Sequence, residues 1–181
     1  MQLENSFEVG APPDVAWRLL NDVPTVLPCM PGAELVEVVS DDSWKAKLHV
    51  KLGPISLQFL ADVDRVEVDT DAGTVVLAVK AREAKGRGAA EARIVSSLAP
   101  IAGGSRVDLR TELELRGAVA QYGRGVIGDV ASTLTDRFAE CLRGKLADVE
   151  RPAAPTEIDG FGLVFRAVWR AFVQRLRGRR A

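Results

Sequence analysis

Alternation of apolar and polar residues over residues 33–116 constrains the fold of this chain more than any other feature. Turn-forming residues interrupt the alternation at positions 41–42, 53–54, 71–73, 84–86 and 102–104. A period of two predicts β-strands, and short turns between such strands predict antiparallel hairpins. With a further short strand at residues 3–9, the pattern predicts an antiparallel sheet of about seven strands.

The predicted sheet has one solvated face and one covered face. Over residues 44–52 every second residue is apolar, and the residues between them are lysines and the single histidine, His49. Such alternation is typical of a sheet that faces water on one side. In the following strand the phase slips at Asp64 and Arg65, which predicts a bulge that curves the sheet.

One strand places small side chains on a single face. Gly88, Ala90, Ala92, Ile94 and Ser96 share this face, and their size leaves space above it. Two interpretations remain open at this point. Either a helix packs closely against the strand, or the space is a cavity for an apolar ligand.

Helical spacing replaces the alternation after Gly117. Apolar residues three or four positions apart from Val119 to Leu146 predict one helix over residues 118–146, about 43 Å long at about 1.5 Å per residue. Residues 13–20 and 25–30 predict two short helices between the first two strands. The predicted class is α+β, a curved antiparallel sheet wrapped around a long C-terminal helix.

Several short sequence motifs, taken in their order along the chain, resemble those of one protein family. LND and PG stand at residues 20–22 and 31–32, KLGPI at 51–55, GRGAA at 86–90 and RGAVAQYG at 116–123. Over residues 1–148 the chain resembles CoxG, a family of carbon monoxide dehydrogenase subunits in the START-like SRPBCC superfamily, which has a helix-grip fold. The chain departs from the family in its short linker and in Tyr122, where Phe is frequent. The Tyr122 hydroxyl has two possible roles, a hydrogen bond to a ligand carbonyl or one to the backbone.

The resemblance implies a non-catalytic accessory protein that recruits a molybdenum-containing carbon monoxide dehydrogenase or a related hydroxylase to the cytoplasmic membrane. It also suggests an apolar ligand, menaquinone or a similar quinone, held without a covalent cofactor between sheet and helix for electron transfer to the quinone pool. The alternative is a pure recruitment or assembly adaptor with a filled core and no ligand. We predict that the lining residues of a cavity are Leu27, Met30, Leu57, Phe59, Ala90, Ala92, Tyr122, Val126, Ile127 and Val130.

Charge separates the chain into an acidic body and a basic tail. Residues 1–150 carry 17 Lys and Arg against 23 Asp and Glu, whereas residues 151–181 carry 7 against 2. An acidic body argues against a nucleic-acid partner. Residues 149–160 are predicted to be a proline-containing linker, and residues 161–181 a basic amphipathic helix.

This predicted helix places aromatic residues opposite arginines, a pattern typical of a helix that lies in the interface of an anionic membrane. The predicted membrane-binding residues are Phe161, Phe165, Arg166, Val168, Trp169, Arg170, Phe172, Leu176 and Arg177. The other interpretation is that the helix docks onto a partner or onto the body itself. Because the N-terminus does not resemble a secretory signal, the expected location is the cytoplasmic side of the membrane, as a peripheral protein.

Residues for catalysis or metal binding are sparse in the sequence. His49 lies on the solvated face of its strand, and Glu83, Glu91 and Glu112 are expected to pair across strands with Arg93 and Arg110. Cys29 and Cys141 belong to no CxxC pattern, so we expect two reduced core thiols and no metal site. The sequence therefore predicts a protein that is not an enzyme.

Overall fold

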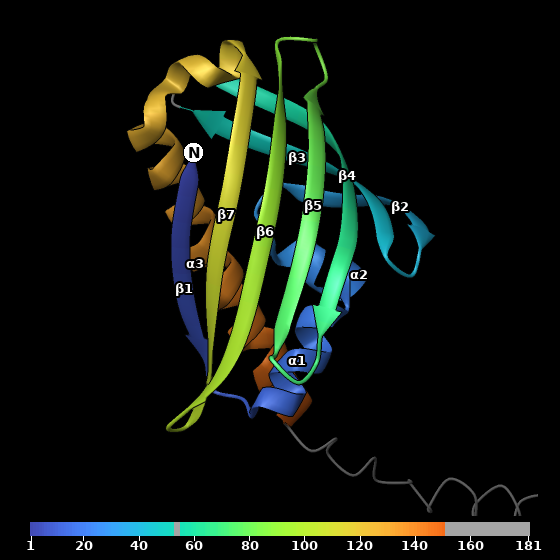
Figure 1. Ribbon diagram of the computed structural model, residues 1–181, viewed down its shortest axis with the longest axis vertical. Helices are drawn as coiled ribbons and strands as arrows, with labels where there is room; N and C mark the ends of the chain where they lie inside the picture. The colour runs from blue at the N-terminus through green and yellow to red at the C-terminus, as the bar shows by residue number, and fades with distance from the viewer. Residues whose placement is uncertain (53–54, 151–181) are drawn as a thin grey trace, which may run out of the picture. The chain divides into compact units, whose positions relative to one another are not determined.

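Seven antiparallel strands form one curved sheet, as the alternation predicts (Figure 1). The computed structural model describes residues 1–52 and 55–150, and the predicted linker from residue 151 and the tail helix lie outside these residues. The strands follow the order β1-β7-β6-β5-β4-β3-β2. Their bounds are β1 Gln2–Val9, β2 Ala33–Ser40, β3 Ser43–Leu52, β4 Ile55–Asp69, β5 Thr74–Glu83, β6 Gly88–Ile101 and β7 Gly104–Gly117.

Two short helices and a 3-10 turn connect β1 to β2. They are α1 (Pro13–Asn21), α2 (Val23–Val26) and η1 (Leu27–Cys29). Asp22 caps α2, because its carboxylate accepts a hydrogen bond from the backbone N–H of Thr25 at 3.2 Å. The predicted pair of short helices between the first two strands is therefore confirmed.

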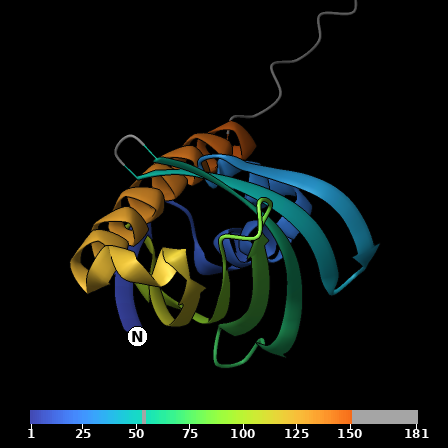
Figure 2. The ribbon, with the colours of Figure 1, turned by 90° about the horizontal axis from the view of Figure 1, so that it is seen from above.

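The long helix α3 spans Gly123–Glu150 and lies along the open side of the curved sheet (Figure 2). Residues 118–122 form a separate 3-10 turn, η2 (Ala118–Tyr122), rather than the first turn of that helix. The cause is local, since Gly117 and Gly123 flank η2 and both adopt a φ of 74°. The helix ends two residues beyond the predicted domain boundary at residue 148.

The sheet bends at a bulge in β4, where the sequence predicts one. The register with β5 shifts between Arg65 and Glu67. The Arg65 side chain holds the bend, because it donates to the Asp42 carboxylate at 2.7 Å and to the backbone carbonyl of Asn21 at 3.0 Å. Its guanidinium also lies 5.5 Å from the centre of the Trp44 ring. The bend and the turn between β2 and β3 are thus fixed together.

Three separate apolar clusters make up the core. The first joins Phe7 and Val107 of the sheet to the second half of α3, including Leu142. The second contains Val23, Trp44 and Val63, and the third contains Leu57, Phe59 and Val119. A fully filled interior of this size generally gives one contiguous cluster. On the inner sheet face, Val79 packs against the second cluster, and Ala81 and Leu115 pack against the third.

A disulfide joins Cys29 of η1 to Cys141 of α3, with their Cα atoms 5.4 Å apart. The expectation of two reduced thiols is therefore wrong. The two residues are 112 positions apart in the sequence, and only the packing of α3 against η1 brings them together. Both do lie in the first apolar cluster, where Cys29 is buried and Cys141 is half-buried.

Candidate ligand cavity and its rim

Three rows of small or apolar side chains cross the inner faces of β5, β6 and β7. The register aligns Val79 with Ala92 and Leu113, and a neighbouring row aligns Ala81 with Ala90 and Leu115. The third row contains Leu77, Ile94 and Thr111. All of these residues are half-buried, and we call them the inner strip.

The inner strip lies outside the principal contacts of the long helix. Helix α3 packs mainly against β1 and η1, at the edge of the sheet rather than over β5 and β6. Since a helix packed over the strip would bury its side chains, their half-exposure shows that α3 does not cover them. The inner strip is the candidate binding surface, and its composition suits an apolar ligand.

The predicted lining residues surround the inner strip in several clusters. Leu57, Phe59 and Tyr122 meet in the third apolar cluster, near one end of the strip. Ala90 and Ala92 belong to the strip itself. Leu27 packs with the second cluster, and Met30, Ile127 and Val130 are half-buried, whereas Val126 is 45% exposed. Ligand contact by these residues remains a prediction.

Gly88, which also belongs to the small-residue face, has a structural reason to be small. A Cβ atom at this position would lie 2.8 Å from a methyl group of Val119 in η2. At this residue the close-packing interpretation is correct. Ala90 and Ala92, further along the same face, are half-buried and continue to support the cavity interpretation.

A buried ion pair closes one end of the inner face. The Glu83 side chain is only 1% exposed, and its carboxylate accepts a hydrogen bond from the Arg87 guanidinium at 2.7 Å. It also accepts from the backbone N–H groups of Lys85 and Arg87. The guanidinium hydrogen bond is the main cause that lowers the pKa of Glu83 to about 2, against the opposing effect of burial.

Arg87 connects three segments around this end. Its guanidinium donates to the Ser56 carbonyl at the start of β4, at 3.2 Å, and its own carbonyl accepts from the N–H of Ala118 in η2, at 2.8 Å. The sequence analysis missed this connection. The sequence does contain a signal for this ion pair, because Glu83 and Arg87 stand four residues apart in a turn that contains Gly86.

The predicted partners of the three glutamates are wrong. Glu83 pairs with Arg87, and Glu91 lies 3.4 Å from Arg116, while Arg93 pairs with Glu67 and Arg110 with Glu4. The three carboxylates also do not converge, since Glu83 is on the inner face and Glu91 and Glu112 are on the outer face. His49 is exposed, as expected. Within residues 1–52 and 55–150, no three metal-ligating side chains gather at one point.

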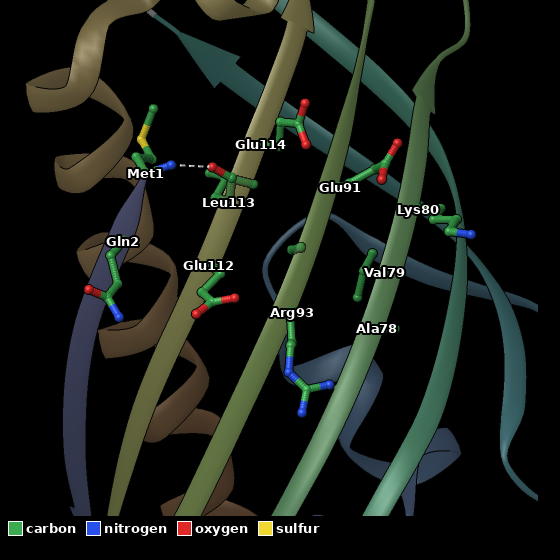
Figure 3. A pocket seen from close by; sticks show the side chains of 11 residues that line it. Met1, Gln2, Ala78, Val79, Lys80, Glu91, Arg93, Glu112, Leu113 and Glu114 are labelled. Atoms are coloured by element: carbon green, nitrogen blue, oxygen red, sulfur yellow. Dashed lines mark hydrogen bonds between the residues drawn. The ribbon is translucent and has the colours of Figure 1, made fainter.

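A depression of about 650 Å³ lies on the outer face of the sheet, on the side away from α3 (Figure 3). Charged side chains of both signs line it, including Lys80, Arg93, Glu91 and Glu112. The N-terminal ammonium of Met1 donates to the Leu113 carbonyl at its edge, at 2.6 Å. Val79, Ala92 and Leu113 of the inner strip also contribute to its lining. Because its charged side chains make this open surface unsuited to an apolar ligand, the inner face of the strip remains the candidate site.

Over residues 6–147 the sequence matches the model of the CoxG family, which is described as a subunit of carbon monoxide dehydrogenase. A search among curated proteins finds no match. No helix within the described part of the chain is long and apolar enough to cross a membrane.

Solved structures share the fold at low sequence identity. A conserved protein from Geobacillus kaustophilus is 23% identical, with a TM-score of 0.73, over 82% of this chain and 96% of that one. The Zhui aromatase/cyclase from Streptomyces sp. R1128 is 15% identical, with a TM-score of 0.60, over 85% and 98%. Ara h 8.0201 is 15% identical, with a TM-score of 0.54, over 82% and 98%. These similarities confirm the predicted helix-grip fold.

Proposed function

The chain belongs to the CoxG family of carbon monoxide dehydrogenase subunits. On this basis we propose that it recruits a molybdenum-containing carbon monoxide dehydrogenase, or a related hydroxylase, to the cytoplasmic side of the membrane. We further propose that it binds menaquinone or a similar quinone on the inner strip, without catalysing a reaction itself. The bound quinone would take up electrons at the enzyme and pass them to the quinone pool. Family membership supports the dehydrogenase-associated accessory role.

The observation that supports ligand binding is the half-buried inner strip, which α3 does not cover and which borders the second and third apolar clusters. Apolar area of this kind gains free energy when a ligand covers it, at about 25 cal/mol per Å². A quinone has an apolar ring and side chain and two carbonyl oxygens. The Tyr122 hydroxyl and the nearby Arg87 are candidate donors to such a carbonyl.

Mass spectrometry of an organic extract tests the ligand. The protein is purified from a menaquinone-containing host, extracted and compared with an Ala92→Leu variant prepared in the same way. We expect menaquinone in the extract of the natural chain and less in that of the variant, whose larger side chain occupies the strip. An empty protein that takes up no menaquinone analogue would contradict the carrier proposal.

Membrane recruitment is tested with the full chain. Trp169→Glu and Phe172→Glu together place two charges on the predicted apolar side of the tail, and Arg110→Gln with Arg137→Gln on the body, which changes the net charge by the same amount, is the matched control. We expect the tail variant to lose sedimentation with anionic vesicles and the control to keep it. Equal sedimentation of both variants would contradict the role of the tail.

The adaptor without ligand remains the second candidate. The contact between Gly88 and Val119 favours it locally, because it shows that the sheet and η2 pack tightly at one end. A filled interior along the whole strip would leave the protein empty in the extraction and would make Ala92→Leu strongly destabilising.

A further inference from the structure

Exposed basic side chains gather at the end of the sheet where β3, β5 and β7 finish. Lys51 is the last residue but one of β3, Arg82 and Lys85 flank the end of β5, and Arg124 is the second residue of α3. We call these four residues the basic rim. None of them forms an ion pair with a carboxylate among the described residues. Their charge is thus available to a partner.

The segments that carry the basic rim are physically joined. Arg87 in the turn after β5 bonds to Ser56 at the start of β4 and to Ala118 in η2. Arg124 donates to the Gln2 carbonyl of β1 at 3.2 Å. The ends of β3 and β4 also lie beside the first half of α3 in both views (Figures 1 and 2). One end of the body therefore presents all four cations.

Exposed apolar side chains occur at the same end. Ile55 at the start of β4 is 37% exposed, and Val126 in the first turn of α3 is 45% exposed. The first turns of α3 have open space beside them, because a Cβ atom at Gly123, Gly125 or Gly128 would meet no other atom within 4 Å. This is also the end at which Tyr122 packs in the third apolar cluster with Leu115 of the inner strip.

The opposite ends of the same strands carry the opposite charge. Asp41 and Asp42 form the turn that precedes β3, and Asp69 and Asp71 flank the turn between β4 and β5. A negatively charged surface therefore attracts the basic rim and repels the far end of the body. This distribution favours an orientation in which the basic rim faces such a surface.

We propose that the basic rim, with Ile55 and Val126, is the face on which the folded body lies against an anionic membrane, with the rim end of the inner strip turned toward the lipid. The inference rests on the proposed membrane recruitment and adds an orientation to it. Isolated apolar side chains beside cations suit insertion among lipid headgroups. A stable protein interface generally needs a contiguous patch of about 800 Å² on each partner, and Ile55 and Val126 do not supply one.

The test compares two full-length variants of equal charge. The rim variant carries Lys51→Gln, Arg82→Gln and Lys85→Gln, and the control carries Arg106→Gln, Arg110→Gln and Arg137→Gln, which are exposed residues away from the rim. Binding is measured on vesicles of phosphatidylcholine and phosphatidylglycerol in equal parts. We expect the affinity of the rim variant to fall roughly tenfold or more, and that of the control much less. Hydrogen exchange on the natural chain should slow at residues 55–60 and 82–88 when vesicles are present.

The outcomes separate this inference from the proposed function. If the natural chain binds vesicles but the two variants bind equally, the tail alone holds the membrane and the orientation is wrong. If the rim variant binds vesicles normally but no longer captures the dehydrogenase, the rim is a protein-binding face and the inference is overturned. If the natural chain does not bind vesicles, membrane recruitment itself fails, while the ligand extraction still decides the carrier proposal.

Discussion

Replacing Ala92 by leucine distinguishes a hollow interior from a filled one by the sign of its effect on stability. Ala92 is half-buried in the inner strip, between Val79 and Leu113. Leucine adds three carbon atoms, and each buried CH₂ group contributes about 0.8 kcal/mol. If the space above Ala92 is empty and the new atoms become about half-buried, the free energy of unfolding should rise by about 1 kcal/mol. In a filled core the same change should cost about 1–3 kcal/mol.

Ala46→Leu is the matched control for this experiment. Ala46 lies on the same face of the sheet, but it is only 6% exposed, so leucine should be overpacked there. Urea unfolding of the ligand-free proteins gives both free energies. We expect stabilisation at position 92 and destabilisation at position 46. Destabilisation of similar size at both positions would refute the hollow strip and the carrier proposal with it.

Three further predictions concern the cross-link, the buried ion pair and the bulge. Cys29→Ser with Cys141→Ser should lower the free energy of unfolding by up to about 5 kcal/mol, since the disulfide closes a loop of more than 100 residues. Urea titration of the oxidised chain and of the variant measures the difference. A loss below about 1 kcal/mol would contradict the prediction. The folded-state pKa of Glu83 is about 2, below its unfolded value of 4.5, so its stabilisation is present above pH 4.5 and is lost as the pH falls toward 2. Glu83→Gln should reduce the fall in melting temperature between pH 4.5 and pH 2, measured by circular dichroism. An unchanged fall would argue against the ion pair. Arg65→Lys should lower the free energy of unfolding in urea by about 2 kcal/mol, because lysine cannot reach all the acceptors of the guanidinium at once. An unchanged unfolding midpoint would show that the bulge does not depend on these hydrogen bonds.

The strands and their curvature are predictable from sequence because each depends on local information. Turn residues at positions 41–42, 84–86 and 102–104 separate the strands, and the phase slip near Arg65 corresponds to the observed bulge. The helix start is less predictable. Its apolar spacing continues through residues 118–122, but the positive φ angles of Gly117 and Gly123 separate this turn from α3.

The contacts that define the candidate site depend on tertiary structure. Cys29 and Cys141 show no sequence pattern for a disulfide, and η1 and α3 must dock before the two sulfur atoms meet. A cross-strand arginine is the partner that the sequence predicts for Glu83, yet the turn after β5 folds back and supplies Arg87 instead. The small residues of β6 predict space beside the sheet, but only the position of α3 at the β1 edge indicates where that space lies.

The disulfide also determines how the body responds to mechanical force. Any pull on the chain beyond Glu150, as between a bilayer and a body held by an enzyme, first loads the C-terminal end of α3. Unwinding of the helix can proceed only as far as Cys141, where the cross-link transfers the load to η1. The first half of α3 and the strands β2 to β7 lie inside the covalent loop. A pull on the C-terminal end therefore leaves the first half of α3 wound.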